Sequence, residues 1–430
     1  MLRTVASQSF VAVTLAAILL TSAPATEKIS SHEENVEGLN SPASQGQKPS
    51  SLAVKLNWLD QNPPTTAQGV SWGVPWPQGS VKKDATFKLG DAKGNQFDVQ
   101  SWPMAYWPDG SLKWSGHAIA ASSKIVGPLT IEPGNTAPTQ TPLQINGTAD
   151  SFEIKNGSAI WRLAKKGVSL VESITVGKQI VAQNGKLVCT VEDRSDLKKN
   201  RTVREEDFVS EITSVKLEQS GSIRAVAKIE GKHKSTSAER TWLPFTVRLY
   251  FFTGVDSVKM VHTFIFDGKE DKDFIRGLGV RFTVPMRQQA HNRHIRLAGE
   301  SGVFAEPVRI ISGRRPPGGD LYAKQIAGKQ LPDLNQLPGK QNIADMAQWD
   351  DFKLKQNSAD SFNIQKRTGD HSSWISAVSG KRSLGMAFLG DTTGGIAAGM
   401  RNFWQLHPTG LEVHGATTKA AEMTVWLWSP

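Results

Sequence analysis

Residues 101–118 read SWPMAYWPDGSLKWSGHA, and this stretch decides how the N-terminal part of the chain folds. Pro108 fixes φ at the first corner of a turn, Asp109 can accept a hydrogen bond from its own main chain, and Gly110 supplies the positive φ that closes the turn. Large rings flank the turn on both sides, at Trp102, Tyr106, Trp107 and Trp114. The stretch predicts a tight hairpin whose rings either fill a small core or form a wall for sugar stacking, and it does not separate these two interpretations.

Short strands with turn signals surround this hairpin and predict a small β-barrel over residues 51–140. In residues 70–81, Pro75 and Pro77 exclude both a helix and a regular central strand. We expect a rigid loop or a strand end here that presents Trp72 and Trp76.

Residues 141–430 read as one strand after another, and no amphipathic helix is evident. Thr241–Thr253 and Val258–Asp267 are the most apolar segments, separated by a short turn, and predict the paired central strands of a sandwich. Gly313–Lys340, rich in proline and glycine, predicts a long loop. The expected fold class is therefore all-β, with a small N-terminal barrel followed by a large antiparallel β-sandwich.

Residues 1–25 have the pattern of a secretory signal peptide. Arg3 precedes an apolar run at residues 10–20 (FVAVTLAAILL), and Ala23-Pro24-Ala25 offers a small-x-small cleavage site. The run is short for a membrane span, although a retained anchor is the alternative. Residues 26–50 are polar and predict a disordered linker. We expect a secreted or periplasmic protein without a membrane span after cleavage.

The formal net charge of +10 is spread along the chain and favours an anionic partner. Nucleic acid is one candidate, but no zinc-finger spacing, RNP-like motif or basic helix indicates it. An acidic polysaccharide fits the charge equally well, and the secretory pattern at the N-terminus favours it as the partner. Cys189 is the one cysteine, which excludes an intrachain disulfide, and its position in a strand-like run predicts a buried residue.

Several blocks in order along the chain resemble the exo-rhamnogalacturonan lyase family (PcRGLX/YetA-like). They are SWGVPWPQGS (71–80), the hairpin stretch, RTWLPFTVRLYFFTG (240–254), VHTFIFDG (261–268), DFIRGLGVRFTVP (273–285), NRHIRLAGESG (292–302), RNFWQ (401–405) and TVWLWSP (424–430). The resemblance implies a RIFT-type barrel, a central β-sandwich and a C-terminal α/α toroid. Because family members continue past WLWSP, we expect this sequence to be the barrel-plus-sandwich part of such a protein.

The implied reaction is β-elimination at galacturonate in rhamnogalacturonan. It needs a cation for the C6 carboxylate, a base for the proton on C5, and an acid or water for the leaving oxygen. Arginine suits the first task. The candidate catalytic residues are His294, His371 and Asp370. The candidate substrate-binding residues are Arg293, Arg296, Arg276, Arg401, Trp72, Trp76, Trp107, Trp374 and Trp404.

Each candidate has a structural alternative. Arginines on strands often lie on a solvent-exposed face without any binding role. Asp370-His371 can be an Asx turn with a surface histidine. His262, within an apolar strand, is expected to be buried and hydrogen-bonded.

No metal-ligand spacing is present, so no metal and no cofactor is expected, although Asp350-Asp351 and Asp271-Asp273 are conceivable calcium ligands. A non-catalytic carbohydrate-binding protein is the alternative to the lyase, and a hydrolase is third. The sequence does not determine the oligomeric state.

Overall fold

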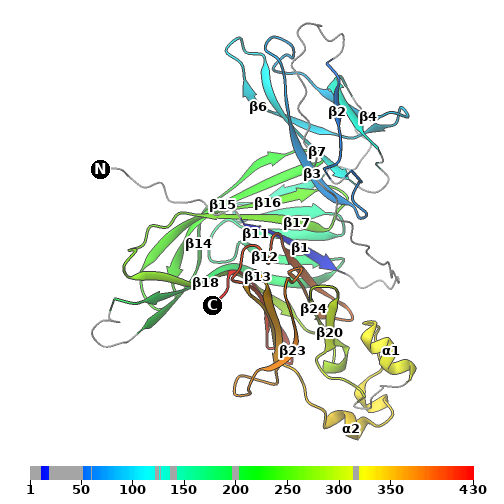
Figure 1. The fold of residues 1–430 in the computed structure, drawn as a ribbon, viewed down its shortest axis with the longest axis vertical. Helices are drawn as coiled ribbons and strands as arrows, with labels where there is room; N and C mark the ends of the chain where they lie inside the picture. The colour runs from blue at the N-terminus through cyan, green and yellow to red at the C-terminus, as the bar shows by residue number, and fades with distance from the viewer. Residues whose placement is uncertain are drawn as a thin grey trace. The chain divides into compact units, whose positions relative to one another are not determined.

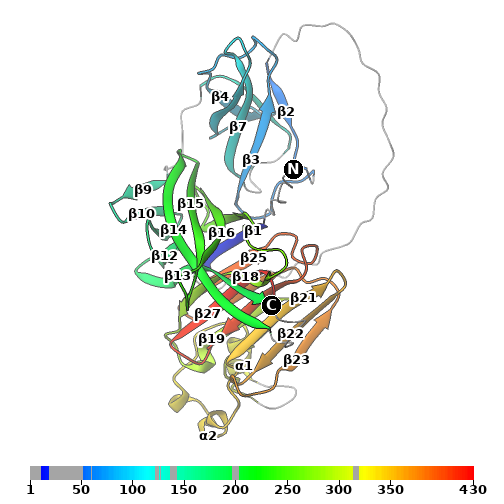
Figure 2. The same ribbon diagram turned by 90° about the vertical axis from the view of Figure 1, so that its left-hand side faces the viewer.

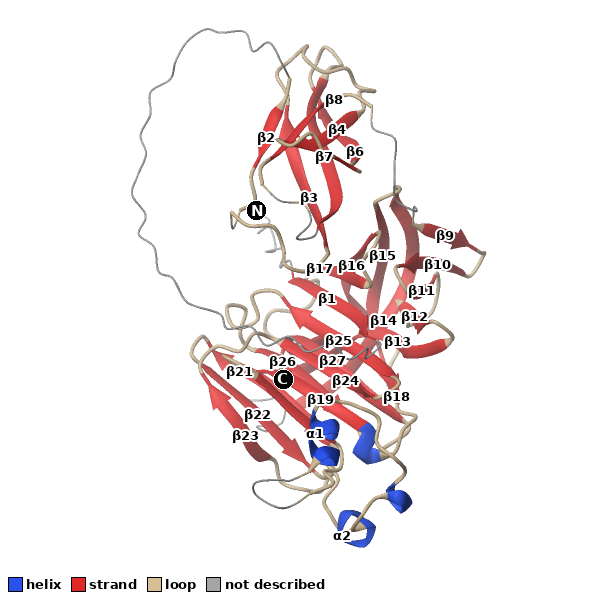
Figure 3. Ribbon diagram, turned by 90° about the vertical axis from the view of Figure 1, so that its right-hand side faces the viewer, coloured by secondary structure: helices blue, strands red, loops and turns tan. Residues whose placement is uncertain are grey.

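The computed structural model describes residues 11–18, 52–59, 61–121, 125, 127–135, 143–195, 203–312 and 319–430. Strands dominate these residues, and the helical segments are short (Figure 1, Figure 3). The prediction of an all-β fold with a small barrel followed by a large antiparallel sandwich is confirmed. No helix among the described residues combines the length and the apolar character that a membrane crossing requires.

The chain divides into two compact units. The barrel unit comprises residues 21–66 and 71–139, and the sandwich unit comprises residues 1–20, 67–70 and 140–430. Two sheets build the barrel unit. One contains β2 (Val54–Leu56), β8 (Leu129–Pro133), β4 (Phe87–Asp91) and β5 (Gln96–Phe97); the other contains β3 (Gln68–Pro75), β7 (Leu112–Ala121) and β6 (Gln100–Tyr106).

The predicted hairpin is present as the pair β6–β7. Gly110 has φ of 79°, and its N–H donates to the carbonyl of Trp107 at 2.9 Å, which closes the turn as expected. Behind the turn, the buried His117 ring is bonded to Ser101 and Ser115. Burial lowers the pKa of His117 to about 4. The hairpin therefore contributes to a packed core as well as to the surface.

The strands of the sandwich unit form two runs, and neighbouring strands within each run are antiparallel. β13 (Gln179–Asp193) belongs to the first run and also pairs with the first strand of the second run. The first run is β9 (Gln144–Gly147), β10 (Ser151–Asn156), β11 (Ala159–Ala164), β12 (Val171–Val176), β13, β18 (Asp273–Pro285), β27 (Ala420–Trp428), β26 (Thr409–His414), β21 (Asp351–Ser358), β22 (Ser361–Arg367) and β23 (Ile375–Gly380). Figure 2 shows β21, β22 and β23 side by side.

The second run begins with β14 (Arg204–Ser220), β15 (Arg224–Ser235), β16 (Thr241–Phe252) and β17 (Ser257–Phe264). It continues through β1 (Val11–Ile18), β25 (Gly394–Met400), β24 (Met386–Asp391), β19 (Arg293–Ala298) and β20 (Val303–Pro307). The predicted central strands are β16 and β17, and they pair as expected.

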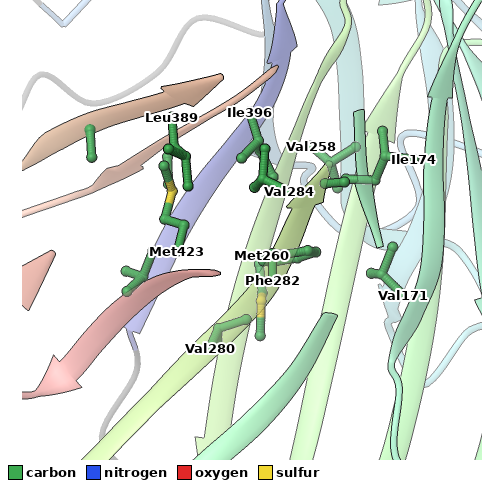
Figure 4. Close-up of a cluster of buried hydrophobic side chains, with 14 of the residues drawn as sticks. Val171, Ile174, Val258, Met260, Val280, Phe282, Val284, Leu389, Ile396 and Met423 are labelled. Carbon is green, nitrogen blue, oxygen red and sulfur yellow. The ribbon is translucent and has the colours of Figure 1, made fainter. Parts of the chain in front are cut away.

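One hydrophobic core lies between the two runs (Figure 4). Val280 and Phe282 from β18 pack there with Val258 and Met260 from β17. These residues alternate along their strands with polar ones, so one face of each strand is buried. Each fully buried aliphatic or aromatic side chain contributes about 1.5–3 kcal/mol, so this core supplies much of the stability. Cys189 is also buried, as predicted.

Helical turns occur where a loop was predicted. α1 (Asp320–Ile326) lies within Gly313–Lys340, with η2 (Leu334–Gln336) after it and α2 (Lys340–Ala344) at its end, while η1 (Ala290–Asn292) precedes β19. The buried Gln325 amide donates to the carbonyls of His291 and Arg309. These tertiary hydrogen bonds fix α1, and a local sequence pattern cannot show them.

Part of the predicted signal segment is a strand, because β1 pairs with both β17 and β25. The remaining predicted signal and linker positions, residues 1–10 and 19–50, lie outside the described residues.

Candidate functional site

Arg293 and His294 occupy β19, and both side chains are buried. The Arg293 guanidinium donates to the carbonyls of Gln288 (2.7 Å), Ala416 (2.9 Å) and Thr418 (2.6 Å). The predicted carboxylate-binding role of Arg293 does not fit this arrangement, because its donors already hold the main chain. Burial lowers the pKa of His294 to about 4, and its buried Nε2 has no partner among the described residues. His294 is thus a neutral interior residue and does not fit the predicted catalytic role.

The other arginine of that predicted cluster, Arg296, is half-buried at the register position between Ala305 and Phe388. Arg401 and Trp404 lie in the turn after β25, with Arg401 exposed. The guanidinium of Arg382 stands 4.4 Å from the centre of the Trp404 ring. His262 is buried, as predicted, but its Nε2 has no hydrogen-bond partner among the described residues.

The predicted tryptophans of the barrel unit differ in exposure. Trp76 is 3% exposed, donates to Ser115 and stacks on Phe87, so its predicted role as a sugar platform does not fit. Trp72 and Trp107 are half-buried. Trp107 donates to the carbonyl of Trp76 and carries the Lys113 ammonium over its ring at 4.4 Å.

Three predicted residues meet on one surface of the sandwich unit. The Arg367 guanidinium pairs with the carboxylate of Asp370 and lies 4.6 Å from the centre of the Trp374 ring. Lys353 approaches the same ring to 3.9 Å, and Lys353 and Arg276 line one cavity. His371, next to Asp370, is exposed. Asp370, Trp374 and Arg276 thus belong to a single surface.

Strand register explains how this surface is built. In β21 and β26, apolar residues point into the core, and the residues between them face outward. Cross-strand pairing places the outward residues in three parallel rows over β22, β21, β26, β27 and β18. The rows are Arg367, Asp351, His414, Glu422 and Thr283; Gln365, Lys353, Glu412, Thr424 and Arg281; and Asn363, Lys355, Gly410, Trp426 and Gly279. We call these rows, with Trp374, Asp370 and Arg276, the β21–β26 face.

A cavity of about 290 Å³ opens on this face, near the lower limit for small-molecule pockets. Lys353, Lys355 and Arg276 supply its cations, and Glu412 and Trp426 also line it. Trp426 is 6% exposed and donates its Nε1–H to Glu412 at 2.7 Å. A Cβ at Gly279 would come within 2.7 Å of the Val425 carbonyl oxygen and 2.9 Å of the Trp426 ring, so a residue larger than glycine would clash there.

His414 carries a positive charge at neutral pH. Its Nδ1 donates to Asp351 at 3.1 Å and its Nε2 to Glu412 at 3.3 Å, and these bonds raise the pKa of His414 to about 10. Burial acts to raise the pKa values of Asp351 and Glu412. Asp351 accepts hydrogen bonds from His414 and Gly415, and Glu412 accepts them from His414 and Trp426. These bonds outweigh burial, so the pKa values of both carboxyl groups are lowered. The three groups therefore form a charged chain across two strands.

The two lysines of the face are less basic than ordinary lysines. Burial lowers the pKa of Lys353, and the neighbouring Lys355 and Arg367 charges lower it further against the opposing effect of Glu412. Burial and the Arg276 charge likewise lower the pKa of Lys355, whose ammonium also donates to the carbonyl of Pro430. A binding anion would relieve the repulsion among these cations.

Asp351, Asp370 and His414 place one ligand atom each within 4.8 Å of one another. Arg367 already pairs with both carboxylates, and the protonated His414 has no free lone pair to offer. A metal ion would have to displace a guanidinium and a proton together, so this donor set does not fit a metal centre.

The His414 charge predicts a pH-dependent stability. Because its pKa rises from 6.5 to about 10 on folding, its contribution is fully present below pH 6.5 and is lost as the pH rises through about 10. After a discount for a side chain one-third exposed, we expect His414→Gln to cost about 2 kcal/mol at pH 6. Urea unfolding at pH 6 and pH 10 measures this difference, which should shrink at pH 10. His371→Gln, at an exposed histidine, is the control, and equal losses at both pH values would contradict the assignment.

Five residues of this face were not predicted from the sequence: Lys353, Lys355, Glu412, His414 and Trp426. Their signal was the strict alternation of charged residues with Phe352, Leu354, Leu411 and Val413 in two segments. That pattern marks a charged sheet face, but it does not show that the two segments pair.

Two family models together match most of the chain. Residues 143–430 match the family described as the PcRGLX-like protein central beta sandwich domain, and residues 52–134 match the PcRGLX-like N-terminal RIFT barrel domain. The "Uncharacterized protein YetA" of Bacillus subtilis (strain 168) is 34% identical over 381 residues, which cover 87% of this chain and 44% of that protein. The chain therefore spans less than half the length of this relative.

Proposed function

The chain belongs to the PcRGLX-like family, and from that premise we propose that it binds an acidic polysaccharide of the rhamnogalacturonan type on the β21–β26 face. Such a polymer carries one carboxylate on every galacturonate unit. A partner of this kind, outside the cytoplasm, also agrees with the export signal expected at residues 1–25.

The observation that carries the proposal is the convergence of Lys353, Lys355 and Arg276 on one cavity. Ammonium and guanidinium groups donate charge-assisted hydrogen bonds to carboxylates, the strongest hydrogen bonds that side chains offer. Arg276 pairs with Glu192 at 3.2 Å and is half exposed, so it can turn toward a ligand at small cost. The carboxylate of Glu412, by contrast, is held by His414 and Trp426.

The Trp374 ring orients the cations of this face. Lys353 and Arg367 both lie against it, and cation–π contacts of this type contribute about 0.5–1 kcal/mol each at partly exposed sites. Arg367 is further fixed by Asp351 at 2.7 Å. A ligand therefore meets cations whose positions are already restricted, which lowers the entropic cost of binding.

A second candidate function is β-elimination itself, and the lowered pKa of Lys353 favours it. Lowering the pKa of a lysine increases the share of neutral amine, which is the form that acts as a base. The neutral amine would take the proton from C5 of galacturonate while a second cation stabilises the carboxylate. The electron pair of the C5–H bond forms the C4–C5 double bond, the C4–O4 bond breaks, and the leaving oxygen takes a proton from water.

Calorimetric titration with rhamnogalacturonan, beside a neutral galactan, tests the binding proposal. We expect saturable binding of the acidic polymer that weakens as salt is added, and little heat from the galactan. Equal affinity for the two polymers, or no binding of either, would overturn the proposal.

The same mixtures, followed by the ultraviolet absorbance of unsaturated uronates, test the second candidate. A rise in absorbance that Lys353→Gln abolishes supports elimination by this lysine. Binding without any rise leaves a non-catalytic carbohydrate-binding protein and rejects the elimination.

A further inference from the structure

The hairpin β6–β7 carries two indoles on the outward face of its sheet, in which β7 lies between β3 and β6 (Figure 1). Ser115 and His117 of β7 are fully buried and hydrogen-bonded to each other inside the barrel unit. Because side chains alternate along a strand, Trp114 and Gly116 face outward. Trp102 of β6 stands opposite Gly116 in the register, so it points to the same side.

The Trp102 ring covers Gly116. A Cβ at Gly116 would lie 2.3 Å from Cε2, 2.5 Å from Cζ2 and 2.5 Å from Nε1 of Trp102. A point beyond the ring but in its plane would be closer to Nε1 and Cζ2 than to Cε2, so the Cβ position lies over the ring face. One face of the Trp102 indole therefore rests on the strand, and the other points away from the sheet. The half-buried state of Trp102 agrees with this orientation.

Trp114 extends this aromatic surface toward β3. Its side chain is 40% exposed. The Cε3 and Cζ3 atoms of its ring lie 3.5 and 3.6 Å from a Cβ position on Gly73 of β3, so the ring stands beside a glycine as well. Positions 114 and 116 are about 6.7 Å apart along β7. The two indoles are thus offset by about the length of one hexose unit.

The outward positions around the two rings are uncharged. They are Ser71, Gly73 and Pro75 of β3, all exposed, and Ala105 of β6, which stands opposite Trp114. These positions offer no cation to attract a phosphate or carboxylate polymer. Even when fully exposed, two indoles provide about 500 Å² of surface, less than the roughly 800 Å² per partner that a stable protein interface buries. The face therefore suits a small, flat and neutral ligand.

We propose that this outward face of β3, β7 and β6, here called the Trp102–Trp114 platform, binds a neutral β-1,4-linked glucan. All ring substituents of a β-linked glucose unit are equatorial, so its two faces present only C–H bonds and its hydroxyl groups lie at the edge. Such faces stack on indoles while the hydroxyl groups stay in water. The β-1,4 linkage keeps successive units in a flat ribbon, which matches two rings on one sheet face. A galactose unit has an axial C4 hydroxyl that projects from one face and hinders stacking there.

The platform belongs to the barrel unit, whereas the β21–β26 face belongs to the sandwich unit. The two sites also differ in chemistry, because one offers aromatic rings and the other offers cations. The platform therefore does not depend on the proposed binding of acidic polysaccharide, and each site can be tested without the other.

Calorimetric titration of the full chain with cellohexaose tests the platform. We expect weak, saturable binding that does not change with added salt, since no charge takes part. Trp114→Ala should weaken this binding about tenfold, because it removes one of the two stacking rings. Trp114→Phe keeps a ring and should weaken it less. Trp428→Ala is the matched control, since Trp428 is a 47% exposed tryptophan of the sandwich unit, and it should bind cellohexaose as the parent chain does.

Four results would overturn the proposal. They are no binding of cellohexaose by the parent chain, equal losses in Trp114→Ala and Trp428→Ala, equal affinity for cellohexaose and a galactan, and binding that weakens as salt is added. The two sites are separated by exchanging ligands: Trp114→Ala should bind rhamnogalacturonan with unchanged affinity, and K353Q/K355Q should bind cellohexaose with unchanged affinity. A Trp114→Ala chain that loses both ligands to the same extent would also reject the platform, because the loss would then lie in the fold.

Discussion

Replacing Lys353 and Lys355 together by glutamine is expected to weaken binding of acidic polysaccharide about 100-fold. Both lysines line the cavity of the β21–β26 face, and each ammonium group can donate a charge-assisted hydrogen bond to a carboxylate. Such a bond contributes about 1.5 kcal/mol, and the loss of two corresponds to roughly two orders of magnitude in Kd. Calorimetric titration with rhamnogalacturonan measures the change, and the residual binding should depend less on salt than that of the parent chain.

Lys178 and Lys216 provide the matched control for this pair. Both are exposed lysines of the sandwich unit, and their exchange for glutamine removes the same net charge. We expect K178Q/K216Q to change the affinity less than about threefold, as the loss of a diffuse long-range attraction would. If the two double variants weaken binding equally, net charge and not this cavity attracts the polymer.

Arg293→Ala is expected to lower the free energy of unfolding by about 4 kcal/mol. The substitution leaves the carbonyls of Gln288, Ala416 and Thr418 without their common donor, and each unsatisfied buried carbonyl costs about 1–3 kcal/mol. These bonds join β19 to the turn that precedes β27, so their loss also loosens two segments distant in sequence. Urea denaturation measures the effect.

Arg296→Ala is the natural comparison, because Arg296 lies on the same strand and is half-buried. We expect it to cost under about 1 kcal/mol. The folded fraction of Arg293→Ala should bind polysaccharide with unchanged affinity. A loss of affinity at unchanged stability would restore Arg293 to the substrate site and reject its role in holding the main chain.

The fold was largely predictable because its signals are local. Pro108 and Gly110 predict their turn from backbone geometry alone, and the alternation in β16 and β17 reports burial on one face. α1 was not predictable, since its stability depends on hydrogen bonds from Gln325 to residues 16 and 34 positions away. The pairing of residues 11–18 as β1 was equally hidden, because an apolar run fits a leader and a strand alike.

The site was predicted only in part, for a related reason. Asp370, Trp374 and Arg276 were chosen for their residue types, and they do lie on one surface. Arg293 and His294 were chosen on the same basis, but both side chains are buried. Polar residues in a strand suggest a solvent-exposed face, and the local sequence does not reveal that other elements cover both faces of this strand. The cavity arises from register between β21, β26 and β27, and two of its lining residues, Lys355 and Pro430, lie 75 positions apart in the sequence.

The pairing of β18 with β27 has a consequence for biosynthesis. β18 is translated some 140 residues before β27, the strand that completes its edge, so the ribosome must deliver the residues up to β27 before these two strands can pair. Contacts of such long sequence separation slow folding, and the apolar faces of β13 and β18 remain open to misassociation in the meantime. These strands therefore gain from any factor that keeps them unfolded until β27 has been made.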